Sequence, residues 1–238
     1  MVRLRYNAPM RSSRPRLLPL AQGTTKELLL TGAPCVASLL TAMVWPTLFT
    51  VSLAAILVVL FGLVLFFFRD PERQPPAAEG AFLAPADGEV MEVGRVQEPL
   101  FIQGEALRIG IFMSVLSVHV NRSPIDGRVA LLKHNPGLFL QAFRPESSEL
   151  NENNLVGLTY PGGKVLLKQI AGILARRIVC WASVGQELRA GERFGLIKLG
   201  SRVEIFVPPD SIPQVELGDK TTAGVTVVAR LKASPDDE

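Results

Sequence analysis

The sequence predicts a mostly β protein, an antiparallel β-sandwich or barrel-like domain that follows an N-terminal α-helical membrane hairpin. Two observations predict this class. Residues 28–68 form a run of 41 positions without a charged side chain, about twice the roughly 20 residues that a helix needs to cross a bilayer. After residue 82 the chain changes to short apolar runs separated by Gly, Pro, Asn and Asp, which is typical of strands and turns.

Residues 1–27 form a basic tail. They contain six basic residues and one acidic residue, a net charge of +5, whereas the rest of the chain carries −2. Because the basic excess lies beside an apolar segment, we interpret it as a cytoplasmic tail under the positive-inside rule, attracted to anionic headgroups. It is not interpreted as a nucleic-acid-binding face. The apolar segment is too long and begins too late for a cleavable signal peptide.

Residues 28–68 are predicted to be the membrane anchor. Trp45 and Pro46 lie near its middle, where the proline interrupts a helix and the tryptophan suits a membrane interface. We therefore expect two membrane helices, 28–45 and 48–68. The alternative is a single membrane helix over 47–68, preceded by a half-buried segment. An even number of crossings places both ends of the hairpin, and the domain that follows, on the cytoplasmic side of an inner or plasma membrane.

Residues 69–82 are charged and proline-rich, which predicts a linker. Residues 83–238 are predicted to be the folded domain. No long helical period occurs there, although 137–150 is expected to hold a short helix. Its strand-like segments are "ALRIGIFM", "GRVALLK", "KVLLKQIAG", "RRIVCWAS", "FGLIKLG", "RVEIFVP" and "GVTVVARL".

One short pattern occurs twice in this domain, as "PADGEV" at 85–90 and "PIDGRV" at 124–129. Asp-Gly between apolar runs is the usual chemistry of a hairpin turn. Two similar turns would therefore explain the repeat, and a functional aspartate in one of them is the other interpretation.

Few residues are suited to catalysis. Two cysteines, Cys35 and Cys180, and two histidines make a disulfide or a metal site improbable. His119 stands where an apolar run meets "NRSP", a position where a strand enters a loop and exposes side chains. Together with Ser201 and Asp87 it supplies a general base, a hydroxyl nucleophile and an acid that could orient the base.

Several motifs in order resemble phosphatidylserine decarboxylase of the shorter proenzyme type, over roughly residues 60–230. The most specific is Leu-Gly-Ser at 199–201, combined with the Asp87 and His119 motifs. The segments that carry the resemblance are "FFRDPERQPP", "LAPADGEV", "IFMSVLSVHVNRSPIDGRV", "NENN", "VGQELRAGERFGLIKLGSRVEIFVP" and "TAGVTVVA".

The resemblance implies a zymogen that cuts its own Gly200–Ser201 bond into a β chain, 1–200, and an α chain, 201–238, which stay associated. Gly200 would allow a hydroxyl to approach the backbone closely. The resemblance makes Ser201 the nucleophile, His119 its base and Asp87 the residue that orients His119. Ser201 would become a covalent pyruvoyl group, so neither a metal nor pyridoxal phosphate is expected.

The activity that the resemblance implies is a lyase reaction in phospholipid biosynthesis. It converts phosphatidylserine in the membrane to phosphatidylethanolamine, and His119 is a candidate for a second role in that decarboxylation. The chain departs from the family pattern at Arg202, where many members have Thr or Ser, and at Val115 and Ser117, where related chains read "SPLDVH".

Other functions stay open on the sequence. Turns such as "VGQELRAGERFGLI" also resemble biotinyl or lipoyl-type barrels and membrane-anchored pump adaptors, although no Met-Lys-Met tip or long coiled coil occurs. A decarboxylase of another serine-headgroup lipid and an uncleaved structural homologue are further alternatives. Arg122, Arg128 and Arg144 are candidates for phosphate contact, although a solvated surface charge is the commoner role. A homo-oligomer is compatible with the sequence.

Overall fold

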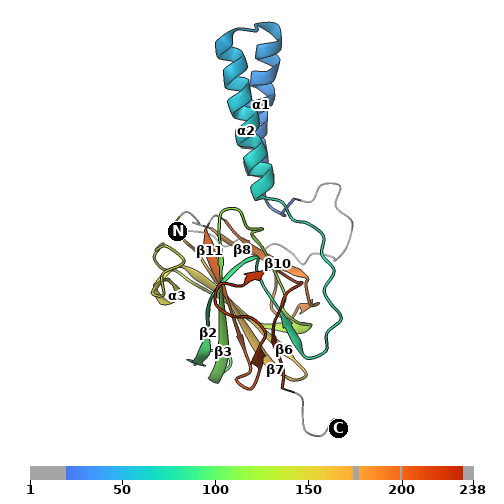
Figure 1. The fold of residues 1–238 in the computed structure, drawn as a ribbon, viewed down its shortest axis with the longest axis vertical. Helices are drawn as coiled ribbons and strands as arrows, with labels where there is room; N and C mark the ends of the chain where they lie inside the picture. Colours follow the sequence, from blue (N-terminus) through green and yellow to red (C-terminus); the bar gives the residue numbers. More distant parts are fainter. Residues whose placement is uncertain (1–19, 174–176, 199, 233–238) are drawn as a thin grey trace. The chain divides into compact units, whose positions relative to one another are not determined.

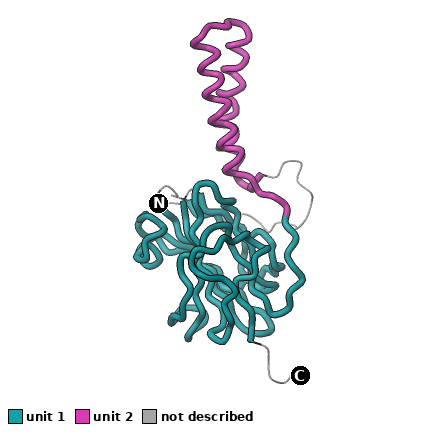
Figure 2. Tube along the Cα trace, viewed as in Figure 1, with its two compact units in different colours: residues 1–13, 73–238 teal, residues 14–72 magenta. Residues whose placement is uncertain are grey.

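The computed structural model describes residues 20–173, 177–198 and 200–232. It divides the chain into two compact units, one comprising residues 14–72 and the other residues 1–13 and 73–238 (Figure 2). Most of the basic tail, residues 1–19, lies outside the described residues. The two units are described separately.

The first unit is a helical hairpin. Helix α1 spans Thr25–Val44 and helix α2 spans Leu48–Phe67, so α1 begins three residues earlier than expected (Figure 1). Both helices are long and apolar enough to cross a membrane, by length and composition. The structure therefore has the two helices of the predicted hairpin.

The turn between the helices follows from local chemistry. Pro46 has no backbone N–H to continue α1, and Thr47 begins α2 with a capping box. Its hydroxyl accepts the N–H of Thr50 at 3.2 Å, and the Thr50 hydroxyl accepts the N–H of Thr47 at 3.0 Å. Such reciprocal bonds satisfy two donors that the first turn of a helix otherwise leaves open.

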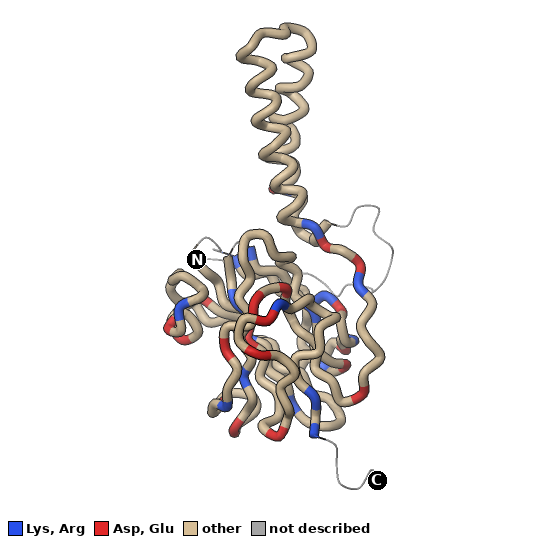
Figure 3. Tube along the Cα trace, in the orientation of Figure 1, with Lys and Arg blue, Asp and Glu red and all other residues tan. Residues whose placement is uncertain are grey.

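The surface of the hairpin is apolar. Charged residues are absent from 28–68 (Figure 3), and large side chains such as Met43 and Leu48 are 84% and 87% exposed. An apolar surface of this extent is unfavourable in water and suits the hydrocarbon layer of a membrane. The hairpin thus has the length and the surface of a membrane anchor.

The second unit is built from strands, which confirms the predicted fold class. The described residues form three sheets in which every paired strand is antiparallel, one of eight strands and two of three (Figure 1). The large sheet has the order β13-β2-β3-β11-β7-β6-β5-β9, and the small sheets have the orders β1-β14-β12 and β4-β10-β8. The large sheet curls into a half-barrel.

The strands have the following bounds: β1 Ala81–Leu83, β2 Gly88–Glu98, β3 Gly104–Met113, β4 Val120–Arg122, β5 Gly127–Asn135, β6 Asn153–Tyr160, β7 Gly163–Ile170, β8 Ile178–Cys180, β9 Glu187–Leu188, β10 Arg193–Ile197, β11 Ser201–Val207, β12 Ile212–Pro213, β13 Lys220–Thr221 and β14 Val227–Arg230. The short helix expected within 137–150 is α3, Ser147–Leu150. Arg73 and the residues after it, which the sequence assigns to a linker, belong to the strand-rich unit.

Strand β11 lies inside the large sheet, and all seven of its residues are buried. It pairs with β3 on one side and with β7 on the other. Val203, Ile205 and Val207 point into the main apolar core. The alternate residues Arg202 and Glu204 point to the opposite face, because successive side chains of a strand alternate between faces.

The repeated Asp-Gly pattern forms two equivalent bends rather than hairpin turns. Each bend leads from a strand of a small sheet into a strand of the large one, from β1 into β2 and from β4 into β5. The N–H of Leu83 donates to the carbonyl of Pro124, and the N–H of Arg122 donates to the carbonyl of Pro85, both at 2.9 Å. The two bends therefore hold each other, and they join the small sheets to the large one.

Candidate active site

Ser201 is the first residue of β11, and it is fully buried. Its register partner on β3 is Met113. The Ser201 hydroxyl donates to the thioether sulfur of Met113, with Oγ and Sδ 3.5 Å apart. A thioether is a weak acceptor, so the hydroxyl is oriented without being held tightly.

Gly200 lies where the chain passes from β10, in a small sheet, to β11, in the large sheet. Its φ of +59° is in the left-handed region, which favours glycine. The carbonyl oxygen of Gly200 also lies against Gly172, where an added Cβ would stand only 1.9 Å from it. Two glycines therefore shape the backbone at the Gly200–Ser201 bond; Leu199, the first residue of the motif, lies outside the described residues.

His119 is fully buried directly before β4, so the expectation that it stands exposed where a strand enters a loop is wrong: the loop leads into a strand here. Its Nδ1 lies 2.8 Å from the carbonyl oxygen of Ser117. Since a carbonyl only accepts, the neutral imidazole must carry its proton on Nδ1, which leaves the lone pair on Nε2. The tautomer is thus the one in which Nε2 acts as a base.

The structure brings His119 to the segment that precedes the Gly200–Ser201 bond. The backbone N–H of Ile197, three residues before Gly200, donates to the His119 carbonyl at 3.3 Å. Ser117 makes the imidazole contact through its main chain, so the contact does not depend on the side chain at position 117.

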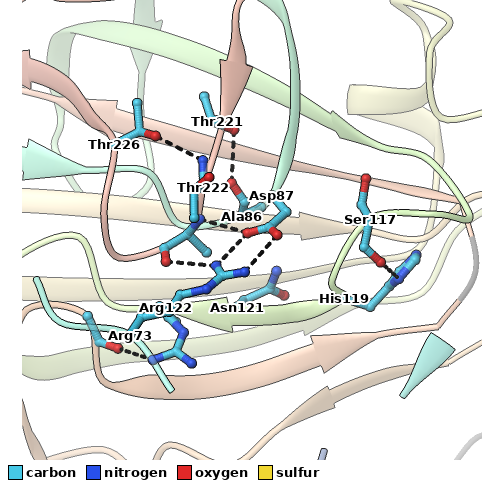
Figure 4. A network of polar contacts seen from close by, with 12 residues as sticks. Arg73, Ala86, Asp87, Ser117, His119, Asn121, Arg122, Thr221, Thr222 and Thr226 are labelled. Carbon is cyan, nitrogen blue, oxygen red and sulfur yellow. Dashed lines mark hydrogen bonds and ion pairs between the residues drawn. The ribbon is translucent and has the colours of Figure 1, made fainter. Parts of the chain in front are cut away.

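Asp87 lies in the first Asp-Gly bend, and its carboxylate is bound by Arg73. The two guanidinium nitrogens of Arg73 donate to the two carboxylate oxygens at 2.5 and 2.7 Å, and the N–H of Ala223 donates to Oδ1 at 2.8 Å. Figure 4 shows this ion pair and the contact between His119 and Ser117 as separate groups of interactions. The orienting role of Asp87 toward His119 stays a prediction.

Asp126 occupies the equivalent place in the second bend. Its Oδ1 accepts the N–H of Ala190 at 2.6 Å, as Asp87 accepts the N–H of Ala223, and an Ala-Gly turn follows in both cases. Holding this turn is therefore a structural task that both aspartates share. The bidentate bond to Arg73 distinguishes Asp87.

Arg202 takes part in a cluster of charges on the opposite face of β11 from Ser201. Its guanidinium binds Glu92 and, at 2.8 Å, the buried carboxylate of Glu204, and Glu92 also binds Arg108. Gly110 leaves the space for it, since an added Cβ there would lie 2.7 Å from an Arg202 nitrogen.

Beside this cluster lies an open cavity of about 480 Å³, lined by Arg202, Arg108 and Glu92 together with Met91 and Phe143. Nearby, burial lowers the pKa of Lys168, and the charge of Glu204 opposes that shift. Arg202 thus has a structural role away from the Ser201 hydroxyl.

The candidates for phosphate contact differ in exposure. Arg122 is buried, and its Nη1 donates to the carbonyl of Gly191 at 3.0 Å. Arg128 and Arg144 are exposed, and Arg144 donates to the side chain of Gln141 at 3.2 Å. The contact of Arg122 fits a structural role.

Within the described residues, no group of three His, Cys, Asp or Glu side chains could hold a metal ion. Burial raises the pKa of the Cys180 thiol to about 11, so this thiol is protonated at neutral pH. The Ser201 hydroxyl is buried next to the point where Gly172 approaches the Gly200 carbonyl oxygen.

Two residues of the site were missed by the sequence analysis. Arg73 belongs to the quoted segment "FFRDPERQPP", yet its composition suggested only a linker. Met113 ends an apolar run and has no polar signal. Each takes its role from a partner distant in sequence, Asp87 for Arg73 and Ser201 for Met113.

The chain is similar in sequence to known proteins over most of its length. A family model described as phosphatidylserine decarboxylase matches residues 60–229. The chain is 46% identical over 201 residues to a phosphatidylserine decarboxylase proenzyme of Symbiobacterium thermophilum, which covers 84% of this chain and 94% of the relative. Proenzymes of the same name from Pelobacter propionicus and Prosthecochloris aestuarii are 52% and 45% identical, over 70% and 87% of this chain and 76% and 93% of the relatives.

The two bends offer a matched test of Asp87. Asp87→Asn and Asp126→Asn should each weaken a bond to an alanine N–H, and each should lower the free energy of unfolding by about 1 kcal/mol. Asp87→Asn should cost roughly 1–2 kcal/mol more, because it leaves the Arg73 guanidinium without its carboxylate. Denaturant unfolding in detergent measures both effects.

If Asp87 orients His119, Asp87→Asn should also slow cleavage at residues 200 and 201 while Asp126→Asn leaves it unchanged. A denaturing gel compares the two. Equal cleavage in both variants would show that Asp87 holds the Ala-Gly turn and does not orient His119.

Proposed function

The chain belongs to the phosphatidylserine decarboxylase family, and we propose that it is a self-processing enzyme that converts phosphatidylserine to phosphatidylethanolamine with a pyruvoyl group made from its own Ser201. The observation that carries the proposal is the backbone around residue 201. A buried serine begins a strand that is paired on both sides, directly after a glycine with positive φ whose carbonyl is closely packed.

Self-cleavage begins at the Ser201 hydroxyl. With Nε2 of His119 as the base, Ser201 Oγ attacks the carbonyl carbon of Gly200, the peptide C–N bond breaks, and the proton passes to the departing nitrogen. An ester now joins the two residues. Removal of the Cα proton of Ser201 expels the Gly200 carboxylate, and addition of water to the resulting dehydroalanine releases ammonia and leaves the pyruvoyl group.

The two products are a β chain of residues 1–200 and an α chain of residues 201–238. Strand β11 of the α chain is hydrogen-bonded to β3 and β7, which both belong to the β chain. Strand β14 of the α chain likewise pairs with β1. These ladders support the proposal that the chains stay associated without a covalent bond.

The pyruvoyl group supplies a carbonyl that accepts the electron pair released when carbon dioxide leaves the serine headgroup. Among the residues of this chain, His119 is proposed to move the proton that replaces the lost carboxylate. Burial of residue 201 keeps bulk solvent away from the reacting carbon, while the single water molecule that the dehydroalanine step consumes must still reach it.

The family membership decides against the adaptor interpretation, and no observation favours an uncleaved homologue or a different serine-headgroup lipid. We propose that the hairpin of α1 and α2 anchors the enzyme in the inner or plasma membrane, with both ends cytoplasmic. The basic tail and the uncharged span support this orientation.

Processing is the first test. The purified protein should separate into a large fragment and a small one that begins with a blocked residue 201, whereas Ser201→Ala should remain at full length. His119→Ala should slow cleavage by about a hundredfold or more, because it removes the general base. Denaturing gels with intact mass measure all three proteins.

His134→Ala is the matched control, since His134 lies on β5, and it should cleave normally. A cut form of Ser201→Ala, or an essential His134, would contradict the assignment.

The reaction itself is the second test. The processed protein should release carbon dioxide from phosphatidylserine without added pyridoxal phosphate or metal. Reduction with cyanoborohydride in the presence of substrate should abolish turnover and leave a stable adduct on the 201–238 fragment, detectable by mass. Uncleaved Ser201→Ala serves as the inactive control. Turnover that survives reduction, or that requires pyridoxal phosphate, would exclude the pyruvoyl mechanism.

Topology is the third test. A cysteine introduced at Ser12 or Ala77 should resist an impermeant thiol reagent in intact cells and react after the cells are opened. A cysteine at Thr47, between the helices, should react from outside. Cys35 and Cys180 are both buried, so their background should be low. Labelling of Ser12→Cys or Ala77→Cys in intact cells would overturn the orientation.

A further inference from the structure

A chain of buried side-chain amides ends beside Ser201, and the proposed reaction does not use it. Asn154 Nδ2 donates to Gln169 Oε1 at 3.0 Å, and Gln169 Nε2 donates to Asn121 Oδ1 at 2.7 Å. Asn121 Nδ2 then donates to the sulfur of Met113 at 3.7 Å. All four side chains are fully buried.

The fold makes room for these amides at several places. Asn154 on β6 and Gln169 on β7 are register partners in the large sheet, whereas Asn121 belongs to β4 in a small sheet. Gly195 on β10 lies against the Gln169 amide, where an added Cβ would stand 2.8 Å from Nε2. The amide chain therefore bridges the two sheets that the Gly200 segment connects.

Each hydrogen bond fixes the direction of the next. Gln169 Oε1 accepts from Asn154, so the NH₂ group of Gln169 faces Asn121 Oδ1, and the NH₂ group of Asn121 faces Met113. Buried amides are costly unless they are hydrogen-bonded, and apolar side chains of the same size would fill this space more cheaply. A buried chain of amides is therefore expected to hold a particular group in place at its end.

That group is the Met113 sulfur, which receives a hydrogen bond from Asn121 and another from the Ser201 hydroxyl. We propose that Met113, held in place by Asn121, Gln169 and Asn154, is a positioning residue that selects the rotamer in which Ser201 attacks the Gly200 carbonyl. This inference rests on the proposed self-cleavage.

The chemistry of methionine suits this role. Its side chain has three rotatable bonds, so without the Asn121 contact the sulfur would occupy several positions. The Ser201 hydroxyl has three staggered rotamers, and a fixed acceptor favours one of them. Because a thioether is a weak acceptor, it orients the hydroxyl and still releases it for the attack, whereas a carbonyl or carboxylate would retain it.

The test measures the rate of self-cleavage of newly synthesised full-length protein. Met113→Leu keeps the apolar volume and removes the acceptor, and it should slow cleavage roughly five- to tenfold, the effect of one lost hydrogen bond. Asn121→Leu and Gln169→Leu should slow it similarly. The double variant of Met113→Leu and Asn121→Leu should be no slower than the slower single variant, because both act on one contact.

A second measurement separates positioning from general destabilisation. Intact mass distinguishes a small fragment that begins with pyruvoyl from one that begins with serine, which forms when water cleaves the ester. Variants in which the Ser201 side chain is mispositioned should give a larger share of the small fragment that begins with serine. Asn135→Leu is the matched control, since its amide donates to Asn153 and is not part of the chain; it should leave both rate and product unchanged.

Cleavage of Met113→Leu at the wild-type rate or faster, with wild-type products, would overturn the inference and leave the proposed function standing. Absence of cleavage in the wild type would overturn the proposed function itself. If Met113→Leu lowers the melting temperature, its slower cleavage could come from lost stability. Gln169→Leu then decides between lost stability and lost positioning, because it leaves Met113 and Asn121 in place. Wild-type rate and products from a folded Gln169→Leu would likewise overturn the inference.

Discussion

The backbone ladder that holds β11 between β3 and β7 is the constraint on which the rest of the site depends. Residues 201–207 pair with 113–107 on one side, and residues 202–206 pair with 170–166 on the other. An interior strand with both edges paired has little freedom to shift along its axis or rotate. Residue 201, as the first residue of this strand, is therefore held in a defined place while the glycine before it makes the turn from another sheet.

The alternation of side chains along β11 separates two tasks. Ser201 points toward Met113 and the main core, where the chemistry is proposed to occur, whereas Arg202 points to the other face and binds Glu92 and Glu204. The ion pairs thus hold the start of the strand without placing a charge beside the hydroxyl. Arg202 therefore supports the start of the strand on the face away from the hydroxyl.

The two Asp-Gly bends have the same local structure, but within the described part of the chain only the aspartate of the first bend binds an arginine. Both bends exchange backbone hydrogen bonds, and both aspartates hold an alanine N–H. Arg73 comes from the segment before β1 and binds Asp87. The difference between the two aspartates therefore comes from a third segment of the chain, and the bends themselves are alike.

Several features follow from the sequence by itself, because they depend on neighbouring residues. The uncharged run broken at Trp45-Pro46 determined the two helices, short apolar runs determined a β domain, and Leu-Gly-Ser indicated the family. The tertiary structure alone decided that the Asp-Gly bends cross between sheets, that Arg73 binds Asp87, and that Met113 receives the Ser201 hydroxyl. Those contacts join residues 14 to 88 positions apart, and no local periodicity encodes which distant side chains the sheet order brings together.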